Sequence, residues 1–232
     1  MSDVTIHYHF TLEDGSEETF ELALDEKTLE LRATDSADHP AWTELGFRQC
    51  HHCPLEPATS PQCPAAAKLV WLVQGFARVL SHERVRVEVR TTERATTLNA
   101  SAQEAVSSLM GLIMAVSGCP HTAFFRPMAR FHLPGATTEE TIYRATSMHM
   151  LAQYYVRLAG GDPDLVFADL VQRYEAVQEV NRAFVQRLRA AADSDATINA
   201  LVVLDGWALS MPWAIEESLK GLRHLFEPYL DQ

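Results

Sequence analysis

The sequence predicts an α+β fold in which a small antiparallel sheet packs against a mostly helical C-terminal half. Apolar and polar residues alternate near the N-terminus, as is typical of strands, and the alternation returns once after an intervening helix. Most of the chain after residue 135 has helical periodicity. No repeat or linker divides the 232 residues, so we expect one domain over residues 1–232. A soft division separates a sheet and cysteine half (1–134) from a helical half (135–232).

The sheet is expected to begin with an N-terminal hairpin. Val4, Ile6 and Tyr8 share one face of the first strand, and the pair Asp14-Gly15 is a strong turn signal. The segments "TFELAL" and "TLELRA" continue the alternation, which gives two or three antiparallel strands. The later segment "ERVRVEVRTTE" has the same period of two, so we expect its strand to join this sheet.

Helices account for most of the remaining chain. Pro64 suits a first helical position, Ser101 with Glu104 forms a capping box, and Gly118 suits a helix end. A proline at position 212 predicts a break between the last two helices. The predicted helices span residues 64–82, 101–118, 137–161, 163–193, 196–211 and 212–230.

Composition and charge exclude some classes of partner. The net charge of −12 and the lack of a basic run predict that the protein does not bind nucleic acid. The N-terminus lacks the pattern of a secretory signal, and the longest apolar runs are shorter than the roughly 18 to 20 residues that span a membrane. We therefore expect a cytoplasmic protein without membrane contact, in which cysteines are more typically ligands or catalytic groups than disulfides.

The four cysteines predict a metal centre. Cys50 and Cys53 have the spacing by which one turn presents two sulfurs, and Cys63 lies at a helix start, where the dipole favours a thiolate. Cys119 directly follows the helix that ends at Gly118, so all four thiols lie in loops or at helix ends. The pattern predicts a single four-cysteine site for a [4Fe–4S] cluster or Zn²⁺, with the cluster slightly favoured.

The cysteine segment leaves several functions open. A cluster would support electron transfer or redox sensing, whereas zinc would stabilise the fold or staple a protein-interaction module. Alternatively, Cys50 and Cys53 act as the pair of a thiol-dependent oxidoreductase, or the four thiols are unrelated buried side chains. His51, His52 and His121 are further ligand or hydrogen-bonding candidates. No nucleophile elbow, Walker loop or dinucleotide glycine fingerprint occurs, and the sequence does not decide whether the protein is an enzyme.

A second segment, "HTAFFRPMARFHLP", concentrates cationic side chains in an acidic protein. Arg126, Arg130 and His132 predict a pocket for a small anionic ligand beside the cofactor, because arginine binds carboxylate and phosphate groups in a bidentate way. The competing interpretation is that these arginines pair with Glu139, Glu140 or other surface carboxylates. The expected partners are thus a small anionic ligand or a redox protein.

The blocks "CHHCPL", "SGCP", "MARFHLP" followed by "EET", and "AQYY" resemble the signature segments of an uncharacterised bacterial protein family. The resemblance extends from about Gln49 to the C-terminus. It implies no activity. It implies only that the cysteine segments and the Arg–His segment belong to one recurrent module.

Overall fold

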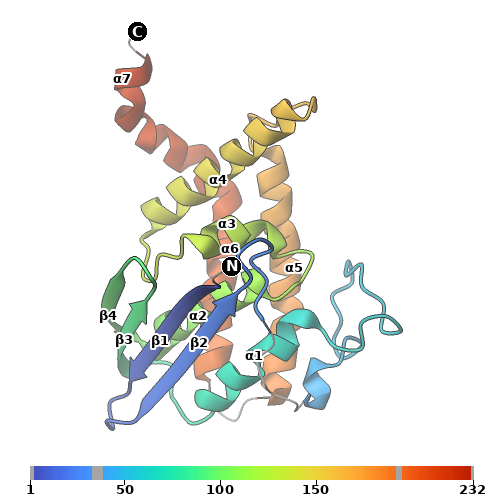
Figure 1. The fold of residues 1–232 in the computed structure, drawn as a ribbon, viewed down its shortest axis with the longest axis vertical. Helices are drawn as coiled ribbons and strands as arrows, with labels where there is room; N and C mark the ends of the chain where they lie inside the picture. Colours follow the sequence, from blue (N-terminus) through green and yellow to red (C-terminus); the bar gives the residue numbers. More distant parts are fainter. Residues whose placement is uncertain (1–2, 33–38, 192–194, 231–232) are drawn as a thin grey trace.

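The computed structural model describes residues 3–32, 39–191 and 195–230. Within them, four antiparallel strands form one sheet and long helices stand beside it (Figure 1). The strands are β1 (Val4–Thr11), β2 (Glu17–Leu24), β3 (Arg84–Arg90) and β4 (Ala95–Ser101), in the spatial order β2-β1-β3-β4. The predicted α+β class, with an N-terminal hairpin, a later strand and a helical C-terminal half, is confirmed.

The β1–β2 hairpin forms where the sequence predicts it. The turn residue Gly15 adopts a φ of +83°, which an L side chain rarely takes. The backbone N–H of Ser16 donates to Asp14 Oδ1 over 2.8 Å, so the turn is closed by a side-chain hydrogen bond. This turn sets the register, in which Tyr8 lies opposite Phe20.

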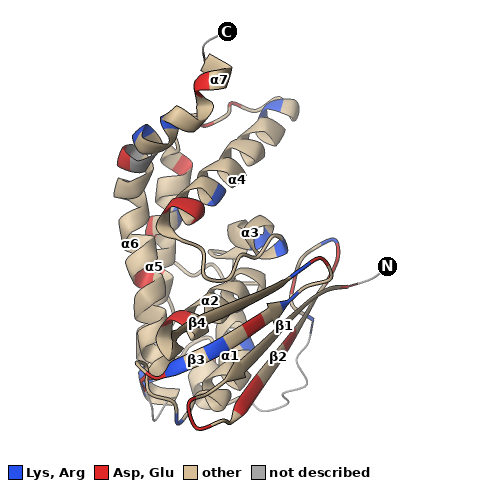
Figure 2. Cartoon of the chain, turned by 90° about the vertical axis from the view of Figure 1, so that its left-hand side faces the viewer, with Lys and Arg blue, Asp and Glu red and all other residues tan. Residues whose placement is uncertain are grey.

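One face of the sheet is buried and the other is solvated. The buried face packs on α1 (Pro64–Gly75) and α2 (Ala102–Val116), which lie behind the sheet in Figure 2. Charged residues follow β2 and β3 on the outer face, as the period of two requires (Figure 2). The buried strand residues are Ile6, Tyr8, Phe10, Phe20, Leu22, Leu24, Val85, Val87 and Val89.

The second half of the chain is helical. Two long helices, α5 (Ala168–Ala191) and α6 (Ala196–Leu222), run side by side along the long axis of Figure 1, and α6 also packs against α2. The remaining helices are α3 (Arg126–Arg130), α4 (Thr138–Leu158) and α7 (Glu227–Leu230), with 3₁₀ turns at Ala41–Thr43, Ala123–Phe125 and Arg223–Phe226.

The buried side chains form two clusters. The larger one joins the sheet to α1, α2 and the adjoining ends of α5 and α6, for example through Phe184 and Leu201. The smaller one joins α4 to the other ends of α5 and α6, through residues such as Ile142, Tyr174 and Met211. Because α5 and α6 contribute to both clusters, these two helices connect the larger cluster to the smaller one.

Several element boundaries differ from the sequence prediction. The strand β4 was not predicted, and it pairs along its whole length with β3. The segment "TLELRA" contributes only an isolated bridge between Leu31 and Leu24 over its described residues. The helix expected to end at residue 82 ends at Gly75, where a Cβ atom would lie 3.0 Å from the Phe20 ring.

The predicted break at Pro212 does not occur, because α6 continues through this residue. Proline has no N–H, so the carbonyl four residues earlier, that of Ala208, loses its helical partner. The Gln178 side chain on α5 replaces that partner, since its Nε2 donates to the Ala208 carbonyl over 3.1 Å. A neighbouring helix thus satisfies the carbonyl that would otherwise favour a break.

In the described part of the chain, one stretch of helix, Ala196–Ile215, is long and apolar enough to cross a membrane by length and composition. Its mean hydropathy is 1.4 and 33% of it is buried. The expectation that no apolar segment reaches this length is wrong here. Uninterrupted apolar runs are short, but Asp205 is the one charged residue among these twenty. Ala200, Leu201 and Ala208 on this helix are buried.

Candidate functional site

The cysteine segment folds into turns before α1. The N–H of Cys53 donates to the Cys50 carbonyl over 3.0 Å, which closes the predicted turn. Cys63 is the N-cap residue of α1, and its N–H donates to the Thr43 carbonyl over 2.8 Å. The sequence therefore placed these three residues correctly with respect to turns and helix ends.

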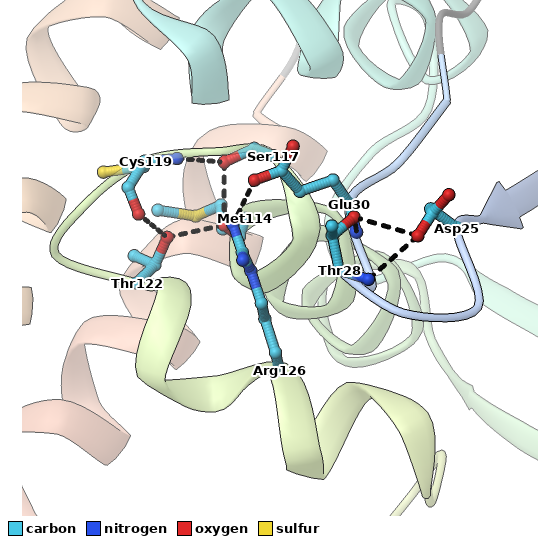
Figure 3. Close-up of polar contacts among 8 residues, drawn as sticks. All are labelled: Asp25, Thr28, Glu30, Met114, Ser117, Cys119, Thr122 and Arg126. Atoms are coloured by element: carbon cyan, nitrogen blue, oxygen red, sulfur yellow. Dashed lines mark hydrogen bonds and ion pairs between the residues drawn. The ribbon is translucent and has the colours of Figure 1, made fainter.

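Cys119 lies in a compact loop after α2 (Figure 3). Gly118 has a φ of +92°, which allows the chain to reverse at the helix end. The Cys119 N–H donates to Ser117 Oγ over 3.2 Å, and the Thr122 hydroxyl donates to the Met114 carbonyl over 2.6 Å. These bonds fix the loop and leave the Cys119 side chain buried.

The predicted metal centre is wrong. Among the described residues, which include Cys50, Cys53, Cys63 and Cys119, no group of three or more His, Cys, Asp or Glu side chains is arranged to hold a metal ion. The [4Fe–4S] cluster, the zinc site and the zinc-stapled module are therefore not supported. All four cysteines are free and no two lie near each other as a pair, so the thiol–disulfide function is also contradicted.

Burial changes the ionisation of three of these thiols. Cys63 and Cys119 are buried within the larger core cluster, and Cys50 and Cys53 pack against it. Burial raises the pKa of Cys50 to about 12, and a thiolate charge on any of the other cysteines would add to this effect. Burial also raises the pKa values of Cys63 and Cys119. The Cys50, Cys63 and Cys119 thiols are therefore neutral at physiological pH.

The three candidate histidines connect the cysteine loops to α5. The His52 Nε2–H donates to the Ala176 carbonyl over 3.1 Å, and His121 Nε2–H donates to the His52 carbonyl over 3.0 Å. The His52 and His121 rings stack with centroids 3.9 Å apart, and His51 lies 3.4 Å from the Glu179 carboxylate. Their contacts are those of packing residues rather than of metal ligands.

The predicted anion pocket is not formed by all three of its residues. Arg126 pairs with Glu30 over 2.7 Å (Figure 3), and Arg130 lies 3.7 Å from Glu93. Both arginines thus have carboxylate partners, although these partners are not the glutamates at the start of α4. His132 points elsewhere, to the wall of a cavity that neither arginine lines.

This cavity has a volume of about 780 Å³ and lies between the sheet and the helices. Its size is within the roughly 300–1,000 Å³ of typical small-molecule sites. Its walls come from β4, from α2 to α6, and from the loops around α3. Apolar side chains predominate, among them Leu98, Leu112, Val177, Leu204 and Trp207.

A chain of hydrogen bonds reaches the cavity wall through His132. The fully buried Tyr8 hydroxyl lies 3.1 Å from Ser108 Oγ and also forms a short hydrogen bond with His132 Nε2. Ser108 and His132 both line the cavity. Burial, and to a lesser extent the charge of Arg144, lowers the pKa of His132 from its usual 6.5 to about 3. The imidazole is therefore neutral at physiological pH.

Arg144 provides a positive charge at the same cavity. It lies on α4 and donates from Nη2 to the carbonyls of Met128 and Phe131, over 3.0 and 2.9 Å. Partial burial lowers its pKa, but arginine stays charged. Tyr174 and Asn181 on α5 add polar groups to the wall. The cavity thus combines an apolar interior with a few fixed polar groups.

Of the residues that line this cavity, the sequence analysis identified His132 alone as a ligand-binding candidate, and it named Glu104 only as part of a helix cap. Arg144 was missed because a single arginine within a helix looks like an ordinary surface residue. Tyr8 did carry a signal, since a tyrosine on the buried face of a strand needs a hydrogen-bond partner for its hydroxyl.

Comparison with known proteins identifies a family of unknown function. No curated protein and no solved structure matches the chain. The family model of a domain of unknown function, DUF6901, matches residues 6–227. This match covers nearly all of the sheet and the helices described above, and the chain therefore belongs to the DUF6901 family.

Proposed function

We propose that this protein binds a small, predominantly apolar molecule in the cavity between the sheet and helices α2 to α6. The observation that carries the proposal is the cavity itself, with its volume of about 780 Å³ and its largely apolar walls. Small-molecule sites commonly combine such walls with a few polar groups that orient the ligand. Ser108, His132 and Arg144 are groups of this kind.

We also propose that the protein acts in the cytoplasm. Its four cysteines are free, and free thiols persist in that reducing compartment. We also propose that the "MARFHLP" block, which supplies the His132 wall, is a signature segment of the family because it shapes the cavity.

Titration with Nile red, a neutral apolar dye, tests the proposal. The test compares two adjacent valines on α6, of which Val203 lines the cavity whereas Val202 is 53% exposed. Val203→Trp places a large ring in the cavity, so it should weaken Nile red binding at least tenfold. Val202→Trp adds the same ring to the surface and should leave the affinity within twofold of wild type.

Two results would contradict the proposal. One is a wild-type protein that does not bind the dye. The other is an equal effect of the two tryptophan variants, which would assign the dye to the exposed apolar surface instead of the cavity.

A further inference from the structure

We propose that the ligand ends in a single carboxylate, which Arg144 and His132 bind at the polar wall of the cavity. The proposal rests on the proposed function, because it assigns the chemical class of the ligand held in that cavity.

Arg144 is the one lysine or arginine among the described residues that line the cavity, and Glu104 is the one carboxylate. The Glu104 carboxylate is already bound, since its Oε2 accepts hydrogen bonds from the N–H and the hydroxyl of Ser101. It is fixed at the start of α2. Arg144 is therefore the charge that remains to interact with a ligand.

Arg144 lacks a carboxylate within ion-pair distance in the described part of the chain. The carboxylate whose charge acts on Arg144 is that of Glu140, which caps α4 by accepting from the Thr137 N–H over 2.8 Å. The two carbonyls bound by Nη2 orient the guanidinium, and its Nε and Nη1 donate to no described residue. These donors can bind a carboxylate of the ligand.

The neutral His132 adds a directed hydrogen bond. In the arrangement that we propose, the Tyr8 hydroxyl accepts from Ser108 and donates to His132 Nε2, which leaves the ring proton on Nδ1. Each hydroxyl in this chain strengthens the next donor. The ring then offers an N–H to an acceptor, and it adds no second positive charge.

This arrangement favours a carboxylate over a phosphate. One guanidinium compensates one negative charge, whereas a phosphate dianion in the same partly desolvated cavity would retain an uncompensated charge. A neutral head group would leave Arg144 without a countercharge. The ligand class that fits both the apolar walls and the single cation is an apolar monocarboxylic acid.

Competition between Nile red and two ligands of equal chain length, decanoate and decanol, tests the head group on the wild-type protein. Decanoate should displace the dye at a concentration at least tenfold lower than decanol. Equal displacement by the two ligands overturns the carboxylate assignment. If both ligands still compete and Val203→Trp weakens both, the cavity function stands while the head-group assignment fails. If neither ligand competes and the dye ignores Val203→Trp, the cavity function fails as well.

Variants of α4 test whether Arg144 causes the preference for decanoate over decanol. Arg144→Met should remove the preference for decanoate over decanol, whereas Arg144→Lys should retain part of the preference. Arg157→Met is the matched control, because Arg157 is exposed on the same helix and does not line the cavity. Retained decanol binding by Arg144→Met shows that the variant is folded. A decanoate preference that survives in this folded variant contradicts the assignment.

Discussion

Arg187 is a buried cation whose partners are backbone carbonyls. It is 1% exposed, and its two terminal nitrogens donate to the carbonyls of Trp42, Glu44 and Leu45 over 2.6 to 3.0 Å. These carbonyls belong to the turn that precedes the cysteine segment. The side chain therefore ties α5 to a loop that contains little regular structure.

Substitution of this arginine should be strongly destabilising. Arg187→Met keeps most of the side-chain volume but removes the donor of the Trp42 and Leu45 carbonyls and one of the two donors of the Glu44 carbonyl, so we expect a loss of about 3 kcal/mol in the free energy of unfolding. Urea denaturation measures it. Arg189→Met, an exposed change on the same helix, should differ from wild type by less than about 0.5 kcal/mol. Similar losses in both variants would show that the carbonyl bonds contribute nothing specific.

The low pKa of His132 predicts an acid-sensitive fold. The folded protein takes up the proton near pH 3, whereas the unfolded chain takes it up near pH 6.5. Between these values the unfolded state binds more protons, so stability falls as pH falls through this window. From pH 6 to pH 4 this residue should contribute a loss on the order of 2 kcal/mol.

Unfolding curves at several pH values test this dependence. His132→Gln should flatten the decrease in stability between pH 6 and pH 4, whatever its effect on stability at neutral pH. His224→Gln changes an exposed histidine and should keep the wild-type slope. A slope that His132→Gln leaves unchanged would show that the folded protein protonates this ring normally.

For individual residues, the sequence predicted the position of a residue along the helices and loops better than it predicted the chemistry of its side chain. Cys63 and Cys119 do lie at helix ends, as their spacing indicated. Their thiols nevertheless turn into the core, because spacing along the chain fixes where a residue lies but not where its side chain packs. The pKa values follow from that burial, which only the tertiary structure reveals.

Helices and strands were predicted best where a short stretch of sequence is enough to specify them. Alternation identified β1, β2 and β3, and the Ser101–Glu104 pair identified the start of α2. The strand β4 was missed because its sequence, "ATTLNAS", lacks large apolar residues at alternate positions. Its pairing with β3 supplies the order that the sequence pattern does not.

The interaction between Gln178 and α6 makes a prediction at this scale. Gln178→Met should cost about 1 kcal/mol in the wild type, because it leaves the Ala208 carbonyl without a donor. In a Pro212→Ala background the same change should cost much less, since the new backbone N–H can donate to that carbonyl. Urea unfolding of the two single variants and the double variant measures the coupling, which should be about 1 kcal/mol.

A matched control keeps this cycle interpretable. Gln186→Met, on an exposed position of the same helix, should cost the same in both backgrounds. If the costs of Gln178→Met are also equal in both backgrounds, Gln178 does not replace the missing helical bond.

At the scale of the whole molecule, two buried clusters share two helices. Leu188 of α5 and Leu201 of α6 belong to the larger cluster, whereas Leu170 and Met211 of the same helices belong to the smaller one. Separate unfolding of one cluster would leave half of each helix without its packing surface. We therefore expect one cooperative transition.

Tryptophans at different places allow this to be measured. Trp71 packs against the larger cluster, and Trp207 precedes Ala208 of the smaller one. In a variant that retains only Trp71, and in one that retains only Trp207, the urea midpoint from fluorescence should equal that from far-UV circular dichroism of the same variant. Two distinct midpoints would contradict the expectation and identify the clusters as independently folding units.

The cavity could not be predicted from sequence, for a reason that belongs to this scale. Its walls include Leu98 from β4, Gly111 from α2, Val177 from α5 and Leu204 from α6. None of these residues is unusual in its own segment. Only the packing of several elements around one space gives them a common role, whereas alternation and capping are properties of short segments.

The position of α6 in the chain also has a consequence during synthesis. The ribosome releases the sheet and α2 early, yet Val203, Leu204 and Trp207 complete the cavity only after about two hundred residues have been made. A nascent chain shorter than this would expose the apolar side chains of α2 and β4 without a binding site between them. If the proposed ligand binds, its capture marks the end of folding and stabilises newly made protein.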